Sequence, residues 1–565
     1  MRMAKVGVLL PRHAAERRWR LGVNVFERYI TEVLDQAGIP FRLLEDSGDL
    51  SAGACDIVVA LLADETAEDA DRLWSYIETG GTAIAFAGLA SFRRRLGCVR
   101  GAAVGPGYAV AGHPAAGEEP LRFLKADPWT PDASGAYEAE SAGVIRQASP
   151  HGAAAGPACL TFRIGEGVLH RWAVDIPGAI VGLQQGTAPV LTDGWPAPDG
   201  TAPYDDGLLK AEDQCELHWD YDRDTTETGN PYFPFPYADA WRELVAGQLL
   251  SAALAKGLTL PFVGAWPDGV DAVGLVSHDS DLNVPESAWT TLDLLAETDI
   301  RSCWCMIEPG FGPDVYERVV RDGHELAFHY NALAKDGGEW SQAAFDRQLA
   351  AFRATIGDER IVSNKNHYTR FEGWGELWQW CEAQGIELDQ TRGPSKRGNV
   401  GMPFGTCRPY FPIAWHDERN RYYDVLQLGF LTQDLDIGTW ADRSIVAPLL
   451  ERVRRVEGVA HFLFHQYHLH YRPEARDALR YVVAEAKRRG FAFWTSREIN
   501  DWERERRSIR IDGVDPDGKP RVRARAVSKP AVAWVPIAEP EPGEALEIKY
   551  GVPCRKALIA AAPQD

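Results

Sequence analysis

The sequence predicts an α/β protein in three parts: a doubly wound domain at residues 1–255, an α/β barrel at 256–505 and a small β module at 506–565. Two observations support this division. Apolar runs typical of buried strands alternate with amphipathic helical segments over residues 1–90, and again from about 264 to 500. From Ser508 onward the sequence changes to short alternating segments around Asp-Gly turns.

The bulk composition excludes several classes of partner. With 565 residues, 45% hydrophobic and 25% charged, the chain resembles an ordinary globular protein with more than one core. A formal net charge of −21 disfavours nucleic acid and anionic membranes.

No apolar stretch reaches the length of a membrane span, and Val6–Leu10 is too short for the core of a secretion signal. Nine scattered cysteines without a C-x-x-C pair indicate a reducing compartment. We therefore expect a cytoplasmic protein, and a homo-oligomer is compatible with the sequence.

The first domain begins with an apolar strand at Lys5–Leu10. An apolar helical face follows over residues 26–37 and ends at Gly38. A second helix is expected after the capping residue Thr66 and before Gly80-Gly81. The further strands are Phe41–Leu44, Asp56–Leu62 and Thr82–Phe86. Strand and helix alternating at this spacing predict a parallel, doubly wound sheet.

The segment from Asp56 to Phe86 resembles the glutamine-amidotransferase-like (flavodoxin-like) domains found beside many glycan-processing enzymes. The catalytic version of that domain needs a cysteine at the turn after the last of these strands. Residues 86–92 here read FAGLASF and contain none. The resemblance therefore implies a non-catalytic domain with a structural or assembly role.

Three stretches lie between this segment and the barrel. Residues 100–156 are rich in Gly, Ala and Pro and are expected to form an insertion or long loop. A hairpin is predicted at Cys159–Ile176, with its turn at Gly165 and Gly167. The aromatic and acidic run from Trp195 to Tyr237 has no useful periodicity. It is either a loop folded over the active site or an irregular connector, and the sequence leaves both open.

Helices of the barrel are marked by periodicity and by caps. Phe345, Leu349, Phe352 and Ile356 repeat at helical spacing along one face. Residues 475–489 form another such segment, which stops at Gly490 before the strand at 491–494. Thr495 and Glu498 then match a capping box, so a further helix should begin there.

Four short motifs in fixed order carry the chemistry. They read SHDSD at 277–281, GHELAFH at 323–329, NKNHYTR at 364–370 and HFLFHQYHLH at 461–470. Each places acidic or imidazole groups beside an apolar run that reads as a strand, and the carboxyl ends of parallel strands are where α/β enzymes place their chemistry. Together they supply an aspartate and two histidines that could bind a metal, and a further acid and base for proton transfer. Such a set of groups can hydrolyse an amide or ester with a metal-activated water.

In order and spacing these motifs resemble the polysaccharide deacetylase (NodB-homology) superfamily, whose fold is a distorted (β/α) barrel of about seven strands. The resemblance covers about Val273 to Asn500. The chain departs from the ordinary pattern: SHDSD replaces TFDDG, and Leu333 stands where the second histidine of HxxxH would be. It is similar to an HDxD-type subgroup with a third motif xHY and a later DxTxG…GTCxPF segment, here at 389–411. In that subgroup His367 would supply the missing imidazole.

The resemblance implies a role for each matching residue. Asp279 aligns with the catalytic base and Asp281 with the metal-binding acid, although the two could exchange roles. His329 and His367 would complete the metal triad, and His465 would be the general acid. Substrate-binding residues are expected among two further groups. Arg370 and Asp389 would steady the acid and base, and tryptophans would stack on sugar rings unless they are core residues: Trp374, Trp378, Trp380 and Trp415.

The sequence thus predicts a hydrolase with a divalent metal, expected to be zinc, that removes an N-acyl group from a sugar or another acylated small molecule. Two other classes stay open. A glycoside hydrolase on a related barrel would need two carboxylates about 5–9 Å apart, flanking one bond. A non-catalytic glycan-binding or assembly protein would keep the barrel and lose the metal.

Overall fold

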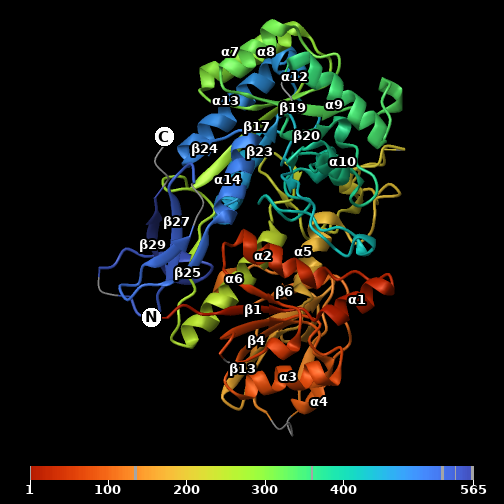
Figure 1. The fold of residues 1–565 in the computed structure, drawn as a ribbon. Coiled ribbons are helices and arrows are strands. Elements are labelled where there is room, and N and C mark those ends of the chain that lie inside the picture. Colours follow the sequence, from red (N-terminus) through yellow and green to blue (C-terminus); the bar gives the residue numbers. More distant parts are fainter. Residues whose placement is uncertain are drawn as a thin grey trace.

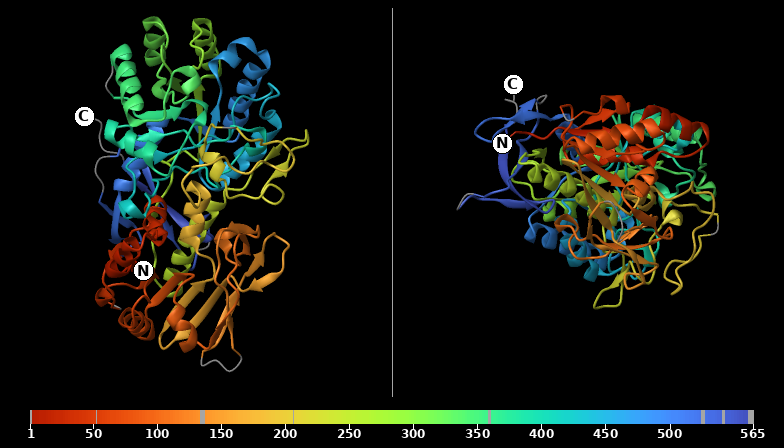
Figure 2. Two further views of the ribbon diagram at one scale, coloured as in Figure 1. Left: turned by 90° about the vertical axis from the view of Figure 1, so that its right-hand side faces the viewer. Right: turned by 90° about the horizontal axis from the view of Figure 1, so that it is seen from below.

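The computed structural model describes residues 2–51, 53–132, 137–205, 207–357, 360–523, 527–540 and 543–560. The N-terminal sheet lies below the barrel-like sheet in Figure 1, and strands from the C-terminal end of the chain lie beside both. Figure 2 shows the same arrangement from two other sides, with the yellow segment that joins the two sheets lying partly beside the barrel. No helix in the described ranges is long and apolar enough to cross a membrane.

The N-terminal sheet has seven strands in the order β2-β1-β3-β4-β13-β12-β9. The first five in that order run parallel, as expected, and β12 pairs antiparallel with both β13 and β9. The predicted hairpin is the β12–β13 pair, and Gly165 adopts a φ of +58° in its turn. The strands are β1 (Val6–Leu9), β2 (Arg42–Leu44), β3 (Ile57–Ala60), β4 (Thr82–Phe86), β9 (Ala139–Ala142), β12 (Cys159–Ile164) and β13 (Gly167–Trp172).

Helices cover both faces of this sheet because its buried strands are apolar on both sides. Val8 and Val59 belong to one hydrophobic cluster, and their neighbours Leu9 and Val58 belong to another. Helices α2, α5 and α6 pack in the first cluster, and α3 and α4 in the second. These helices are α2 (Ile30–Gln36), α3 (Ala67–Glu78), α4 (Ala90–Arg95), α5 (Ile176–Gln185) and α6 (Tyr237–Ala255).

Of the two expectations for residues 100–156, the long loop is wrong for much of the stretch, whereas a structured insertion fits it. Four of its segments form a separate antiparallel sheet in the order β11-β10-β6-β7. These strands are only three or four residues long, and two of them are half or more Gly and Ala, so they carry little of the alternation that identifies strands. They are β6 (Gly107–Val110), β7 (Leu121–Phe123), β10 (Val144–Gln147) and β11 (Ala154–Gly156).

The second large sheet is parallel and barrel-like, in the order β22-β21-β20-β19-β18-β17-β23, with β24 also paired to β17. A parallel bridge between Thr432 and Phe462 brings the chain after β22 back beside β23. The strands are β17 (Ala272–Asp279), β18 (Cys303–Met306), β19 (Glu325–Tyr330), β20 (Ser363–Asn366), β21 (Leu388–Asp389), β22 (Leu426–Gln427), β23 (Val459–Leu463) and β24 (Phe491–Phe493).

Two barrel helices begin directly after a residue whose side chain caps them. In α14 (Ser496–Ser508) the Thr495 hydroxyl accepts from the Glu498 N–H, and the Glu498 carboxylate accepts from the Thr495 N–H. In α9 (Gln342–Ile356) Ser341 accepts from the Ala344 N–H, and Gly357 ends the helix with positive φ. The other long helices are α7 (Pro285–Thr298), α8 (Pro313–Arg321), α10 (Glu376–Gln384), α11 (Val446–Arg455) and α13 (Pro473–Arg488), and the short α12 (Gln466–Tyr471) follows β23.

The β segment expected after residue 506 does not stand alone. β25 (Arg510–Val514) and β26 (Pro520–Arg523) form one hairpin. A second sheet joins β27 (Ala531–Pro536), β28 (Glu547–Lys549) and β29 (Val552–Ile559) to β16 (Phe262–Val263), which lies before the barrel in sequence. A boundary at 506 therefore separates two strands of one sheet. Residues 524–526, 541–542 and 561–565 of this segment lie outside the described residues.

Candidate functional site

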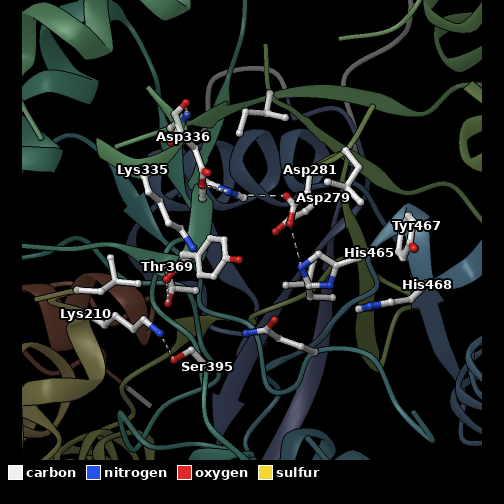
Figure 3. Close-up of a pocket in the computed structure, with 18 of the residues that line it drawn as sticks. Lys210, Asp279, Asp281, Lys335, Asp336, Thr369, Ser395, His465, Tyr467 and His468 are labelled. Carbon is white, nitrogen blue, oxygen red and sulfur yellow. Dashed lines mark hydrogen bonds and ion pairs between the residues drawn. The ribbon is translucent and has the colours of Figure 1, made fainter. Parts of the chain in front are cut away.

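The strand order brings the four motifs to one edge of the barrel. Asp279 ends β17 and Asp281 follows it, while His329 lies near the end of β19. His367 follows β20, and His465 lies two residues after β23. These strands are neighbours or next neighbours and run parallel, so their carboxyl ends open on the same cleft. Figure 3 shows Asp279, Asp281 and His465 facing one another there.

Asp281, His329 and His367 place three donor atoms around one point. Asp281 Oδ1 lies 3.2 Å from His329 Nε2 and 3.2 Å from His367 Nδ1. The two imidazole nitrogens are 3.3 Å apart. Ligands held tetrahedrally at about 2.0–2.1 Å from a zinc ion lie about 3.3–3.4 Å from one another. The spacing and the chemistry of this donor set therefore fit a dication such as zinc, and the three residues form a candidate metal-binding group.

The remaining nitrogens of both histidines have partners that suit this role. His329 Nδ1 lies 2.9 Å from the Lys365 carbonyl oxygen, which can only accept a hydrogen bond. His367 Nε2 lies 3.6 Å from the Asp336 carboxylate. Metal-binding histidines commonly give their second N–H to a carbonyl or a carboxylate, which orients the ring and frees the other nitrogen as a ligand.

A second group, Asp434 with His465 and His468, is held by hydrogen bonds and does not have the spacing of a metal site. Asp434 Oδ2 lies 2.5 Å from His465 Nδ1 and 2.8 Å from His468 Nδ1. These separations suit charge-assisted N–H···O bonds and are too short for two ligands on one zinc ion. Asp434 is fully buried and also accepts from the His465 backbone N–H. It therefore fixes the ring of His465.

The charge of His465 is set by these contacts. Burial alone would lower the pKa of His465, but Asp434, Asp281 and Asp279 outweigh it and raise this pKa to about 10. Burial likewise opposes the charge on Asp434, whereas His465 and His468 lower its pKa to about 2. His465 Nε2 is 3.7 Å from Asp281 Oδ2, so its free nitrogen faces the candidate metal-binding group. A protonated imidazole in that position is suited to donate a proton.

Asp279 is not one of the three residues of the metal-binding group, and it has a buried partner of its own, Lys365. Lys365 Nζ donates to Asp279 Oδ1 at 3.0 Å and to Ser277 Oγ at 2.7 Å. Ser277 Oγ is in turn 2.7 Å from His461 Nε2, and all of these groups are buried. Burial opposes ionisation of Asp279, but the charge of Lys365 outweighs it and lowers the pKa of the carboxyl. Asp279 is thus an ionised carboxylate at the cleft and can accept a proton.

Sequence reasoning missed Lys365, Asp434 and His468 as functional residues. Lys365 carried the clearest signal, because a lysine inside a buried strand needs a counter-charge. His468 lies on α12, one helical turn after His465, and this places it beside Asp434. Asp434 carried no local signal, since only the fold brings residue 434 beside residue 465.

We expect Lys365→Met to lower the free energy of unfolding by about 3–5 kcal/mol, because it leaves the buried Asp279 carboxylate without its partner. Adding Asp279→Asn should restore much of that loss, since the uncompensated charge is then gone. Thermal unfolding midpoints of the wild type, both single variants and the double variant measure this coupling. Strictly additive effects would contradict it.

A cavity of about 900 Å³ adjoins the site. Residues from the connector between the two sheets line one side of it, namely Asp205, Leu208 and Lys210. Lys210 Nζ donates to Ser395 Oγ at 2.7 Å and pairs with Asp205. Part of the connector therefore lines the cleft, which favours the first of the two interpretations of this stretch. The barrel contributes Asp279, Asp281, His367, His465, His468, Trp440 and Tyr467, among others.

The tryptophans predicted to stack on sugars pack in or against the core: Trp374, Trp378 and Trp380 are buried, and Trp415 is half-buried. Trp374 packs between Phe26 and Trp415, and its indole N–H donates to the Ile413 carbonyl oxygen. This cluster lies where the barrel meets the N-terminal sheet, away from the cavity lining. Trp378 and Trp380 are buried among the barrel helices. Sequence alone cannot separate these positions from Trp440, which lines the cavity with its ring stacked on His465 at 5.9 Å.

Arg370 and Asp389 are also not among the cavity-lining residues. The Arg370 guanidinium binds Glu372 and the Ala332 carbonyl oxygen, and its backbone bridges to Lys210 of the connector. Asp389 is fully buried and accepts from Asn364 and Thr391. The predicted assistance to the acid and the base is therefore wrong for these two side chains. Lys365 contacts the proposed base and Asp434 contacts the proposed acid instead.

Comparisons with known proteins found no matching family model and no matching curated protein. Among solved structures, a Mycobacterium smegmatis protein described as a polysaccharide deacetylase is 16% identical, with a TM-score of 0.32 over 43% of this chain and 93% of its own. One from Bordetella bronchiseptica, described as a polysaccharide deacetylase involved in O-antigen biosynthesis, is 16% identical, with a TM-score of 0.27 over 39% and 90%. A β-galactosidase from Rahnella sp. R3 is 15% identical, with a TM-score of 0.24 over 30% and 28%. At TM-scores this low, the likenesses do not decide between a deacetylase and a glycoside hydrolase.

Proposed function

We propose that this chain is a metal-dependent hydrolase that removes an N-acyl group, N-acetyl in the simplest case, from a sugar or glycan substrate. The observation that carries the proposal is the set of three donor atoms 3.2–3.3 Å apart, with an ionised carboxylate and a protonated imidazole beside it. A dication held by Asp281, His329 and His367, zinc by preference, would polarise the acyl carbonyl and provide water of lowered pKa.

Two side chains would move protons in this reaction. Asp279, kept ionised by Lys365, would accept a proton from water as the carbon–oxygen bond forms. His465, kept protonated and oriented by Asp434, would donate the Nε2 proton to the leaving nitrogen as the carbon–nitrogen bond breaks. The products are a carboxylic acid and an amine. The connector residues Leu208 and Lys210 would help exclude bulk water from the cleft.

For the N-terminal sheet we propose a non-catalytic, amidotransferase-like role in structure or assembly. The turn after β4 supports this proposal. Ala87, Gly88 and Leu89 all adopt positive φ, between +52° and +56°, which makes a sharp strand-to-helix elbow before α4. Such an elbow can present a nucleophile, but these three residues carry no hydroxyl or thiol.

Purified protein should contain about one divalent metal per chain and release acetate from N-acetylated aminosugars. A chelator should abolish the release and zinc should restore it, because the donor set is complete only with the ion bound. Elemental analysis and an acetate assay measure both. Reducing ends formed without acetate would identify a glycoside hydrolase instead. A metal content well below one that zinc does not raise would indicate a binding or assembly protein.

A further inference from the structure

Two buried arginines have no acidic partner. Six arginines are buried among the described residues. Four of them form ion pairs: Arg122 with Asp222, Arg171 with Asp127, Arg408 with Glu243 and Arg506 with Glu503. The remaining two, Arg242 and Arg392, are 1% and 2% exposed and form no ion pair within the described part of the chain.

Most of the donors on these two side chains are unused. Arg392, which follows β21, stacks on Phe404 with its guanidinium carbon 4.4 Å from the ring centre. The Tyr410 hydroxyl lies near enough to act on its charge, but no acceptor among the described residues meets hydrogen-bonding geometry with any of its three nitrogens. Arg242 on α6 donates through Nη2 to Tyr29 Oη and Gln184 Oε1, but Nε and Nη1 have no partner. The amide nitrogen of Gln184, itself fully buried, is also without a partner.

These groups meet at Tyr410. The guanidinium carbon of Arg242 lies 5.7 Å from the Tyr410 ring centre, and the Tyr410 hydroxyl donates to the Gln184 carbonyl oxygen at 3.3 Å. The charges of Arg392 and Arg242 both act on the Tyr410 hydroxyl. Gln184 and Arg242 belong to helices packed on the N-terminal sheet, whereas Arg392 and Tyr410 belong to the barrel. The cluster therefore lies at the junction of the two sheets.

The two acids whose charges act on this cluster, Asp389 and Asp239, form no ion pair with Arg392 or Arg242. Asp389 acts on Arg392 through space, but its oxygens accept from Asn364 and Thr391. Asp239 acts on Tyr410, and its oxygens accept from Thr406 and from the Cys407 N–H. Arginine stays protonated in proteins, so two buried positive charges remain near Tyr410 without an ion-pair partner. Water could satisfy their donors but not their charge, whereas an anion satisfies both.

We propose that Arg392, Arg242 and the Gln184 amide bind a small tetrahedral oxyanion, phosphate or sulfate, at the junction of the N-terminal sheet and the barrel. The near-complete burial of all three side chains favours a free inorganic anion over the phosphate group of a larger molecule. By neutralising charges contributed from both sides, the anion would hold the two sheets together. This site is distinct from the cleft and does not depend on the proposed hydrolase activity.

Thermal unfolding in increasing sodium phosphate, at constant ionic strength set with sodium chloride, tests the site. The midpoint of the wild type should rise with the logarithm of phosphate concentration above the dissociation constant. Arg392→Gln and Arg242→Gln should each weaken the apparent phosphate affinity at least tenfold. Arg523→Gln, a surface control whose side chain is 78% exposed, should respond like the wild type. Asp281→Asn should also keep the response, which separates it from phosphate bound in the cleft.

Crystals of the wild type grown with selenate provide a direct readout that needs no variant to fold. An anomalous peak within hydrogen-bonding distance of Arg392 and Arg242 would support the proposal. A map with only water at that position would overturn it, as would equal stabilisation by phosphate in the wild type and both junction variants.

Discussion

Asp281→Asn and Asp279→Asn should both inactivate the protein, but only the first should strip it of metal. Asp281 Oδ1 lies 3.2 Å from both ligand nitrogens, so its loss should weaken metal binding by more than the roughly 10–100-fold seen for supporting groups. Asp279 lies 3.8 Å from His329 Nε2 and is held by Lys365, so its variant should keep the metal. Removing a base should slow turnover by about 10²–10⁴-fold.

Metal content per chain and initial rates, measured on both variants at saturating zinc, separate the two roles. Asp299→Asn, at a fully exposed carboxylate, is the matched control and should change neither quantity. Loss of metal from Asp279→Asn with retention in Asp281→Asn would reverse the assignment. Full activity in either variant would remove the proposed site altogether.

His465→Ala should also reduce turnover by about 10²–10⁴-fold, with metal content near that of the wild type, because its contribution is proton transfer. Asp434→Asn should slow turnover in a different way. Asp434 is the main group raising the pKa of His465, so its neutralisation should lower that pKa. His465 would then lose its proton at lower pH. The alkaline limb of the pH–rate profile should therefore move to lower pH.

Rates across pH for the wild type and both variants measure this shift. His470→Ala is the matched control. His470 lies on α12, just after His465, but it bonds to Thr290 and does not line the cavity. An unchanged alkaline limb in Asp434→Asn would argue against its role in holding the proton on His465. A fully active His465→Ala would show that another group protonates the leaving nitrogen.

Much of the barrel could be predicted from the sequence, because the signals for its strands and helices each span only a few residues. Buried strands, caps such as Thr495 with Glu498, and glycine helix ends are each read within a few residues. Polar groups at the ends of parallel strands must meet at one edge, so Asp281, His329 and His367 could be expected to converge. The antiparallel sheet formed from residues 107–156 could not be predicted, because its strands of three or four residues are too short to show alternation.

The sequence by itself determined the order of strands and helices and the residue types available at the cleft, since both depend on local periodicity and spacing. Only the tertiary structure decided that Asp281 lies 3.2 Å from both His329 and His367 while Asp279 bonds to another group, because the direction of each side chain depends on its partners. For Asp279 that partner is Lys365, 86 residues away. Distant packing likewise decided that Asp434 holds His465, and that Asp205, Leu208 and Lys210 line the cleft. It also decided that Trp374 and Trp415 pack where the two sheets meet, whereas Trp440 lines the cavity.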